Sequence, residues 1–185
     1  MSGRPETARL VVPVGSRDRI RGPAVAPVTF VEYGDYECPY TRAAYPLIKE
    51  LQRRTGDQLR FVFRNFPLTT VHPHAQHAAE AAEAAGAQGR FWEMYQSLFE
   101  HQDVLTDEAL IGYATTLGLD SNRFARELRQ HLYAARVRED IASGIDSGIN
   151  GTPTFYINGA RHDAPYDLET LLGAVSAAAR GQEFR

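Results

Sequence analysis

Two apolar runs separated by an amphipathic segment constrain the fold of this chain most strongly. Residues 28–33 and 59–66 are rich in β-branched and aromatic side chains, with apolar groups on both faces, which is typical of strands buried inside a sheet. Between them, the apolar residues of 44–51 recur with the spacing of one helical face. A helix between two buried strands predicts a parallel β-α-β unit with a right-handed crossover.

The rest of the chain predicts a helical block and then two strands and a helix. Residues 67–148 carry repeated helical stripes and are too long and too regular for a loop, and we expect 124–145 to form one long helix. Strand periodicity returns at 154–157, where Asn158-Gly159 signals a hairpin. Asp167 then caps a final amphipathic helix.

These patterns divide the chain into three parts. An N-terminal arm, 1–24, is rich in Arg, Gly and Pro, and its apolar run at 10–12 is a candidate edge strand. We expect an α/β domain formed by 25–66 and 149–180, interrupted by a helical insertion at 67–148.

The composition of the chain excludes some classes of function. The chain has 185 residues, 43% of them apolar, and a formal net charge of -3, so it can bury one core and has no global attraction to nucleic acid or anionic membranes. The first ten residues lack the apolar core of a secretory signal, and no stretch of about 18 residues is apolar enough to span a bilayer. We therefore expect a cytoplasmic protein without nucleic-acid or membrane partners.

The single cysteine, Cys38, is the candidate reactive group. One thiol cannot close an intramolecular disulfide, and a structural zinc site would need further Cys or His ligands. Cys38 precedes Pro39 at the expected start of a helix, where unpaired amides and the helix dipole lower a thiol pKa by stabilising the thiolate. The alternative is a small, buried and inert residue.

Separated motifs resemble the DsbA-like thiol oxidoreductases. Residues 30–41 (FVEYGDYECPYT) resemble the strand and Cys-Pro-x-Cys helix start of that family, with Thr41 in place of the second Cys. Residues 151–155 (GTPTF) resemble its cis-proline loop, and motifs between 66 and 94 look like its helical insertion. The resemblance covers about residues 25–180 and implies an α/β thioredoxin fold with an inserted all-helical subdomain.

The resemblance also implies roles for named residues. Cys38 is expected to attack a disulfide, and Pro153, expected in the cis form, to shape the groove beside the sulfur. Glu32 matches a buried acid that moves protons during thiol exchange; the alternative is an acid satisfied within the core. The remaining implied substrate-binding residues are Pro39, Tyr40, Gly151 and Thr152, the last through its main chain.

Thr41 changes the expected chemistry most. Without a second Cys, the mixed disulfide must be resolved by an external thiol such as glutathione, so we expect monothiol exchange with a protein or small molecule that bears a disulfide or glutathione. No tightly bound cofactor is expected. The Thr41 hydroxyl could hydrogen-bond the thiolate, whereas Asp35 and Glu37 would raise the thiol pKa if they lay close and unpaired.

Two further clusters have ordinary explanations. We interpret His72, His74 and His77 as capping and packing groups of the first inserted helix rather than as a metal site, because no thiol or carboxylate completes the set. Five arginines between 123 and 138 alternate with acids, which is typical of a solvated helix face with ion pairs.

Other functions remain open at this stage. Cys38 could be a peroxide-sensing thiol capped by glutathione. Kappa-type glutathione transferases and hydroxychromene-carboxylate isomerases share the expected architecture but typically have Ser at this position. A third class is a non-catalytic member that binds an extended peptide in the groove.

Overall fold

The computed structural model describes residues 8–181, which form a five-stranded sheet and seven α-helices. The strands are β1 (Arg19–Arg21), β2 (Val28–Gly34), β3 (Leu59–Asn65), β4 (Thr154–Ile157) and β5 (Ala160–His162). The helices are α1 (Pro39–Thr55), α2 (Ala75–Gly86), α3 (Phe91–Glu100), α4 (Asp107–Thr116), α5 (Ser121–Arg129), α6 (Ala134–Asp146) and α7 (Leu168–Ala179).

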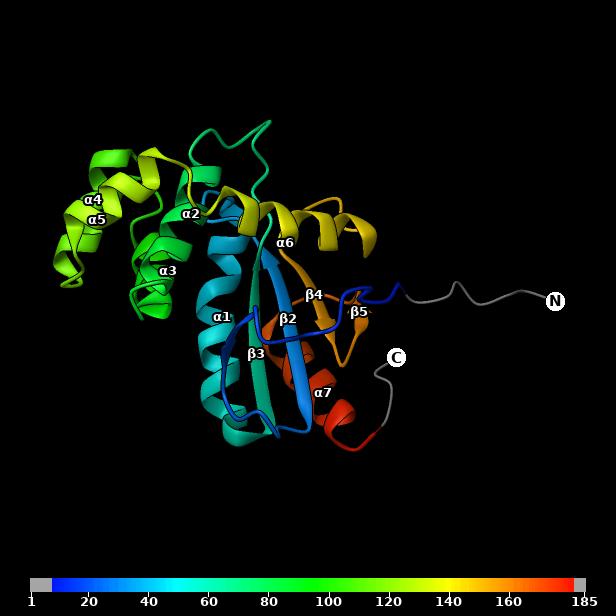
Figure 1. Ribbon diagram of the computed structural model, residues 1–185. Coiled ribbons are helices and arrows are strands. Elements are labelled where there is room, and N and C mark those ends of the chain that lie inside the picture. Colours follow the sequence, from blue (N-terminus) through cyan, green and yellow to red (C-terminus); the bar gives the residue numbers. More distant parts are fainter. Residues whose placement is uncertain (1–7, 182–185) are drawn as a thin grey trace.

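The sheet has the order β1-β3-β2-β4-β5, in which only β2 and β3 pair in parallel. The predicted β-α-β unit is therefore present as β2, α1 and β3. In the larger core, α1 and α7 cover the face that carries Phe30, Phe61 and Phe155. The opposite face, around Val31 and Tyr156, is covered by the arm and α6, which cross the sheet in Figure 1.

Gly34 lets α1 approach the end of β2. A Cβ added there would lie 2.5 Å from Cε2 of Phe63 and 3.0 Å from Cγ2 of Thr41. Real Cβ atoms essentially never approach another atom as closely as 2.5 Å, so a side chain at this position would displace the Phe63 ring and crowd Thr41 in the first turn of α1. The turn that follows Gly34 carries Cys38.

Two sequence predictions differ from the structure. The segment 124–145 is not one helix, because the chain breaks between α5 and α6, where His131 has a φ of 51°. The edge strand at 10–12 is also absent from the described chain: Arg9 makes one bridge to Ala160, and the edge strand is β1 at Arg19–Arg21, inside the predicted arm. Residues 1–7 of that arm lie outside the described range.

Candidate functional site

Cys38 occupies the N-cap of α1, directly after the turn that ends β2. Its backbone is extended (φ -74°, ψ 123°), its side chain makes no capping hydrogen bond, and Pro39 begins the helix. The first amides of a helix have no partner within it, and the helix dipole is positive at this end. The local backbone therefore provides an electrostatic environment that can hold a thiolate.

A loop from the far end of the chain lies against the thiol. The Thr152–Pro153 peptide bond is cis, and Sγ of Cys38 lies 3.4 Å from the carbonyl oxygen of Thr152, to which the thiol donates. The hydroxyl of Thr154 donates to the carbonyl of Gly151 at 2.7 Å, which closes this loop on itself. The loop that contains Pro153 is therefore in direct hydrogen-bond contact with the thiol.

The site is enclosed on one side and open on the other. Cys38 is 3% exposed, and Thr152 is 8% exposed with no hydrogen-bond partner for its hydroxyl among the described residues. Pro39 is exposed, and Tyr40 is 66% exposed. The exposed part of the site is therefore the first turn of α1, where the side chain of Tyr40 faces solvent.

The Thr41 hydroxyl, which the sequence placed within possible reach of the sulfur, has a different partner. The side chain of Thr41 is fully buried, and its hydroxyl accepts from the backbone N–H of Asp35 at 3.5 Å. Between these described residues the structure shows no hydrogen bond from Thr41 to Sγ of Cys38. The hydroxyl instead ties the first turn of α1 back to the preceding turn.

Glu32 lies in the core below the site. It sits on β2 between Phe63 and Phe155 on the neighbouring strands, is 1% exposed, and both carboxylate oxygens lack partners within the described chain. Burial raises its pKa from 4.5 to about 8. A carboxyl group with such a pKa can hold or release a proton near neutral pH.

The two acids beside Cys38 are both paired. The side chain of Asp35 accepts from the backbone N–H groups of Glu37 and Leu68, each at 2.8 Å, and one of its oxygens lies 2.7 Å from Nδ1 of His72. Glu37 lies 2.9 Å from Nδ1 of His74. The acids are therefore held by the loop between β3 and α2.

The histidine interpretation needs a correction. His74 occupies the N-cap of α2, but its side chain makes no capping hydrogen bond. Each of the three histidines instead contacts a different acid: in addition to the two pairs above, His77 lies 2.6 Å from Asp107. No group of three or more metal-ligating side chains converges anywhere in residues 8–181.

Sequence reasoning missed Gln102, which lies in the connection between α3 and α4. It is 9% exposed, and its side-chain amide donates to the carbonyls of Tyr36, at 2.7 Å, and Cys38, at 3.0 Å. The insertion thus fixes the turn that carries the thiol. Nothing in the local sequence distinguishes this glutamine, because its role depends on a contact between residues more than 60 positions apart.

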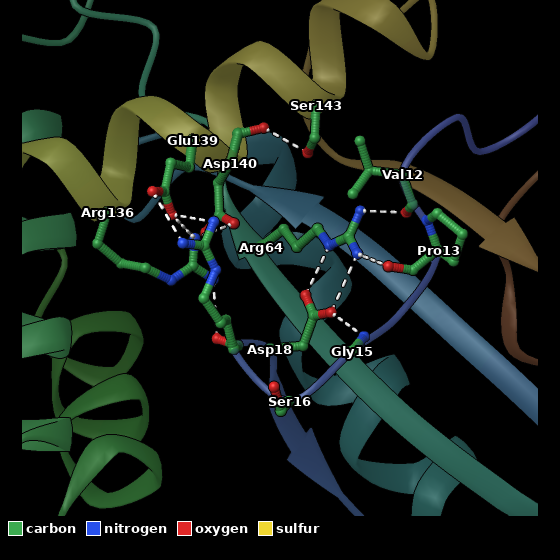
Figure 2. Close-up of a pocket in the computed structure, with 11 residues that line it drawn as sticks. Val12, Pro13, Gly15, Ser16, Asp18, Arg64, Arg136, Glu139, Asp140 and Ser143 are labelled. Atoms are coloured by element: carbon green, nitrogen blue, oxygen red, sulfur yellow. Dashed lines mark hydrogen bonds and ion pairs between the residues drawn. The ribbon is translucent and has the colours of Figure 1, made fainter.

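A separate cavity of about 340 Å³ lies on the other face of the sheet, between the arm, β3 and α6 (Figure 2). The buried Arg64 donates there to Asp18 at 2.7 Å and to the carbonyl of Val12 at 3.0 Å. Arg136 forms an ion pair with Asp140, as the charge pattern predicts, but this pair is largely buried rather than solvated, and burial raises the pKa of Asp140 to about 6. Among the ion pairs that line the cavity, Arg64 with Asp18 joins β3 to the arm, and Arg17 with Glu139 joins the arm to α6.

Comparison with known proteins covers almost the whole chain. The family model described as Thioredoxin matches residues 16–177. The sequence is 50% identical over 177 residues to "Na(+)/H(+) antiporter NhaA 1" of Salinispora arenicola, a match that covers 95% of this chain and 27% of that protein. The chain thus spans about a quarter of the length of this relative. None of the helices found between residues 8 and 181 is long and apolar enough to cross a bilayer.

Solved structures share the fold. Oxidised BdbD from Bacillus subtilis superposes with a TM-score of 0.83 at 24% identity, covering 95% of this chain and 98% of that one. A thioredoxin-like oxidoreductase from Silicibacter pomeroyi gives a TM-score of 0.79 at 26% identity, with coverage of 90% and 94%.

Proposed function

The chain belongs to the thioredoxin family and has the DsbA-like fold, and on this basis we propose that it exchanges disulfides through the single nucleophile Cys38. The observation that carries the proposal is the meeting of the α1 N-terminus with the cis-proline loop, where Sγ of Cys38 lies 3.4 Å from the Thr152 carbonyl. Amides at the helix start would stabilise the thiolate that attacks.

The reaction balances with an external thiol. In a mixed disulfide between a substrate thiol and glutathione, the Cys38 thiolate attacks the glutathione sulfur. The new bond between Cys38 and glutathione forms as the old S–S bond breaks, and the substrate leaves as a thiolate that takes up a proton. A second glutathione thiolate then attacks the Cys38 mixed disulfide, releasing glutathione disulfide and restoring Cys38. Thr41 cannot perform this second attack, because a hydroxyl is not a thiol.

Glu32 and the loop residues would support these steps. With a pKa of about 8, Glu32 can take a proton from the site as the thiol ionises and return it to the leaving thiolate. The backbone of Gly151 and Thr152, with Pro39 and Tyr40 on the exposed side, would hold the substrate chain next to the sulfur.

The test is turnover of a glutathionylated peptide in the presence of free glutathione. We expect the wild-type chain to release the peptide thiol catalytically and Cys38→Ser to abolish release. Thr41→Cys supplies a resolving thiol, so this variant should accumulate an intramolecular disulfide after oxidation, while Thr41→Ser keeps wild-type behaviour. Equal rates for wild type and Cys38→Ser would refute the proposal.

Peptide binding without exchange is the second candidate, and the burial of Cys38 favours it. A thiol that is 3% exposed and donates to a carbonyl resembles an inert cysteine. In that case the chain would bind the peptide equally well as Cys38→Ala and show no turnover. The turnover assay above distinguishes the two candidates.

A further inference from the structure

The loop between β3 and α2 is fastened to the turn that carries the nucleophile. Two acids of that turn, Asp35 and Glu37, each meet one histidine of the loop, His72 at 2.7 Å and His74 at 2.9 Å. The backbone follows the same pairing: the N–H of Leu68 donates to Asp35, and that of His74 donates to Glu37.

Both acids are close to the sulfur along the chain. Glu37 directly precedes Cys38, and the backbone N–H of Cys38 donates to the carbonyl of Asp35 at 3.2 Å. The side chain of Asp35 is fully buried, and that of Glu37 is 20% exposed, so water screens their charges poorly. Negative charge near a thiol opposes its ionisation.

The histidines supply the compensating groups. Each approaches its acid through Nδ1, which can carry a proton in both the neutral and the cationic ring. A cationic ring makes the pair neutral, whereas a neutral ring leaves the charge of the carboxylate in place. The state of each ring therefore sets the net charge of its pair with the acid.

We propose that His72 and His74 are positioning residues that hold Asp35 and Glu37 and offset their charge, so that Cys38 ionises readily near neutral pH. This inference rests on the proposed function, since it concerns the same nucleophile. His72 should have the larger effect, because its side chain is 18% exposed and that of His74 is 47% exposed.

Other charged groups around the turn do not replace these histidines. Glu32 on β2 has no partner among the described residues and adds negative charge only as it ionises, and Tyr36 in the turn is fully buried and neutral near pH 7. Arg42 on α1 is half-exposed and is paired with Asp103 at 2.9 Å. The imidazole rings are therefore the groups that both contact Asp35 and Glu37 and can change charge between pH 5 and 8.

The test is the rate at which iodoacetamide alkylates Cys38 between pH 5 and 9. Asn places an amide N–H near the position of imidazole Nδ1 but carries no charge, so His72→Asn and His74→Asn keep the hydrogen bond and remove the cation. We expect alkylation at pH 6 to slow by about threefold to tenfold in His72→Asn and by less in His74→Asn, with the half-maximal pH moving upward. The control is His77→Asn, which removes the matching pair with Asp107 on the insertion and should leave the profile unchanged.

A double variant separates charge from folding. Asp35→Asn combined with His72→Asn removes both charges and should restore alkylation at pH 6 to at least the wild-type rate. Superimposable profiles for wild type and both single variants, or a double variant as slow as His72→Asn, would overturn the inference. The alkylation assay needs no disulfide substrate, so a chain that alkylates as expected but releases no glutathionylated peptide would contradict only the proposed function.

Discussion

Two buried acids near the end of β2 lie three residues apart and have opposite surroundings. Glu32 and Asp35 are each 1% exposed. Asp35 receives two backbone N–H donors and the ring of His72, whereas Glu32 has no partner among the described residues and its pKa rises to about 8. Burial alone therefore does not determine what a carboxyl group does; the donors that replace water decide whether it organises a turn or stores a proton.

Replacing Glu32 should have the largest effect. Because its pKa in the folded chain lies above the ordinary 4.5, the folded state keeps a proton that the unfolded chain loses, and stability falls as pH rises from about 4.5 to 8. Glu32→Gln removes this cost, with an expected gain of up to about 4 kcal/mol at pH 8 and less than about 1 kcal/mol at pH 5. Urea unfolding at both pH values measures it.

The control for this comparison is Glu108→Gln on α4, which changes an exposed acid and should shift neither curve by more than about 0.5 kcal/mol. An equal change for Glu32→Gln at pH 5 and pH 8 would show that Glu32 has the same protonation state in the folded and unfolded chains.

Replacing Asp35 should act in the opposite direction. Asp35→Ala leaves the amides of Glu37 and Leu68 without their acceptor, at an expected cost of about 3 kcal/mol. Asp35→Asn keeps one carbonyl acceptor and should lose less. Guanidinium unfolding at pH 7 compares the three chains, and a loss below about 1 kcal/mol for Asp35→Ala would mean that this carboxylate does not organise the turn.

Thr41 offers a smaller test of the same turn. Thr41→Val keeps the shape of the side chain but removes the acceptor for the Asp35 amide, which lies at a long 3.5 Å, so we expect a loss of about 1 kcal/mol or less. Thr41→Ser restores the hydroxyl and serves as the control. A more stable Thr41→Val chain would mean that the hydrogen bond to the Asp35 amide makes no net contribution to stability.

Replacing Tyr36 should give the smallest effect, and its direction should be the same as for Glu32: the substitution should not destabilise the chain. Its hydroxyl is buried without a partner among residues 8–181, and burial raises its pKa well above 10. Tyr36→Phe removes an unsatisfied polar group and should leave stability unchanged or raise it by up to about 1 kcal/mol. Thermal unfolding measures the change, and a loss larger than this would reveal a partner for the hydroxyl.

Local pattern predicts much of this fold and only part of the site. The elements β2, α1 and β3 follow from their own residues, because buried strands and amphipathic helices have distinct periods. The break between α5 and α6 does not: Leu128 and Val137 are both buried, but Leu132 between them is 56% exposed, since the chain turns at His131 so that each helix can pack separately.

The groups around the thiol show the same division. The position of Cys38 at a helix start is a local property, and the proximity of Thr152 was implied by resemblance to a family. The pairs of His72 and His74 with their acids, and the contact of Gln102 with the thiol-bearing turn, arise only when the insertion packs against the turn. Sequence spacing does not predict such contacts, because they join elements whose relative placement depends on the packing of the core.

The rate of alkylation of Cys38 at pH 6, in the folded chain and in the same chain unfolded in urea, tests the central claim most directly. If the start of α1 stabilises a reactive thiolate and the histidines offset the neighbouring acids, the folded chain will react faster than the unfolded one despite the 3% exposure of Cys38. A folded chain that reacts more slowly than the unfolded chain would show an inert, protected thiol and would contradict the account.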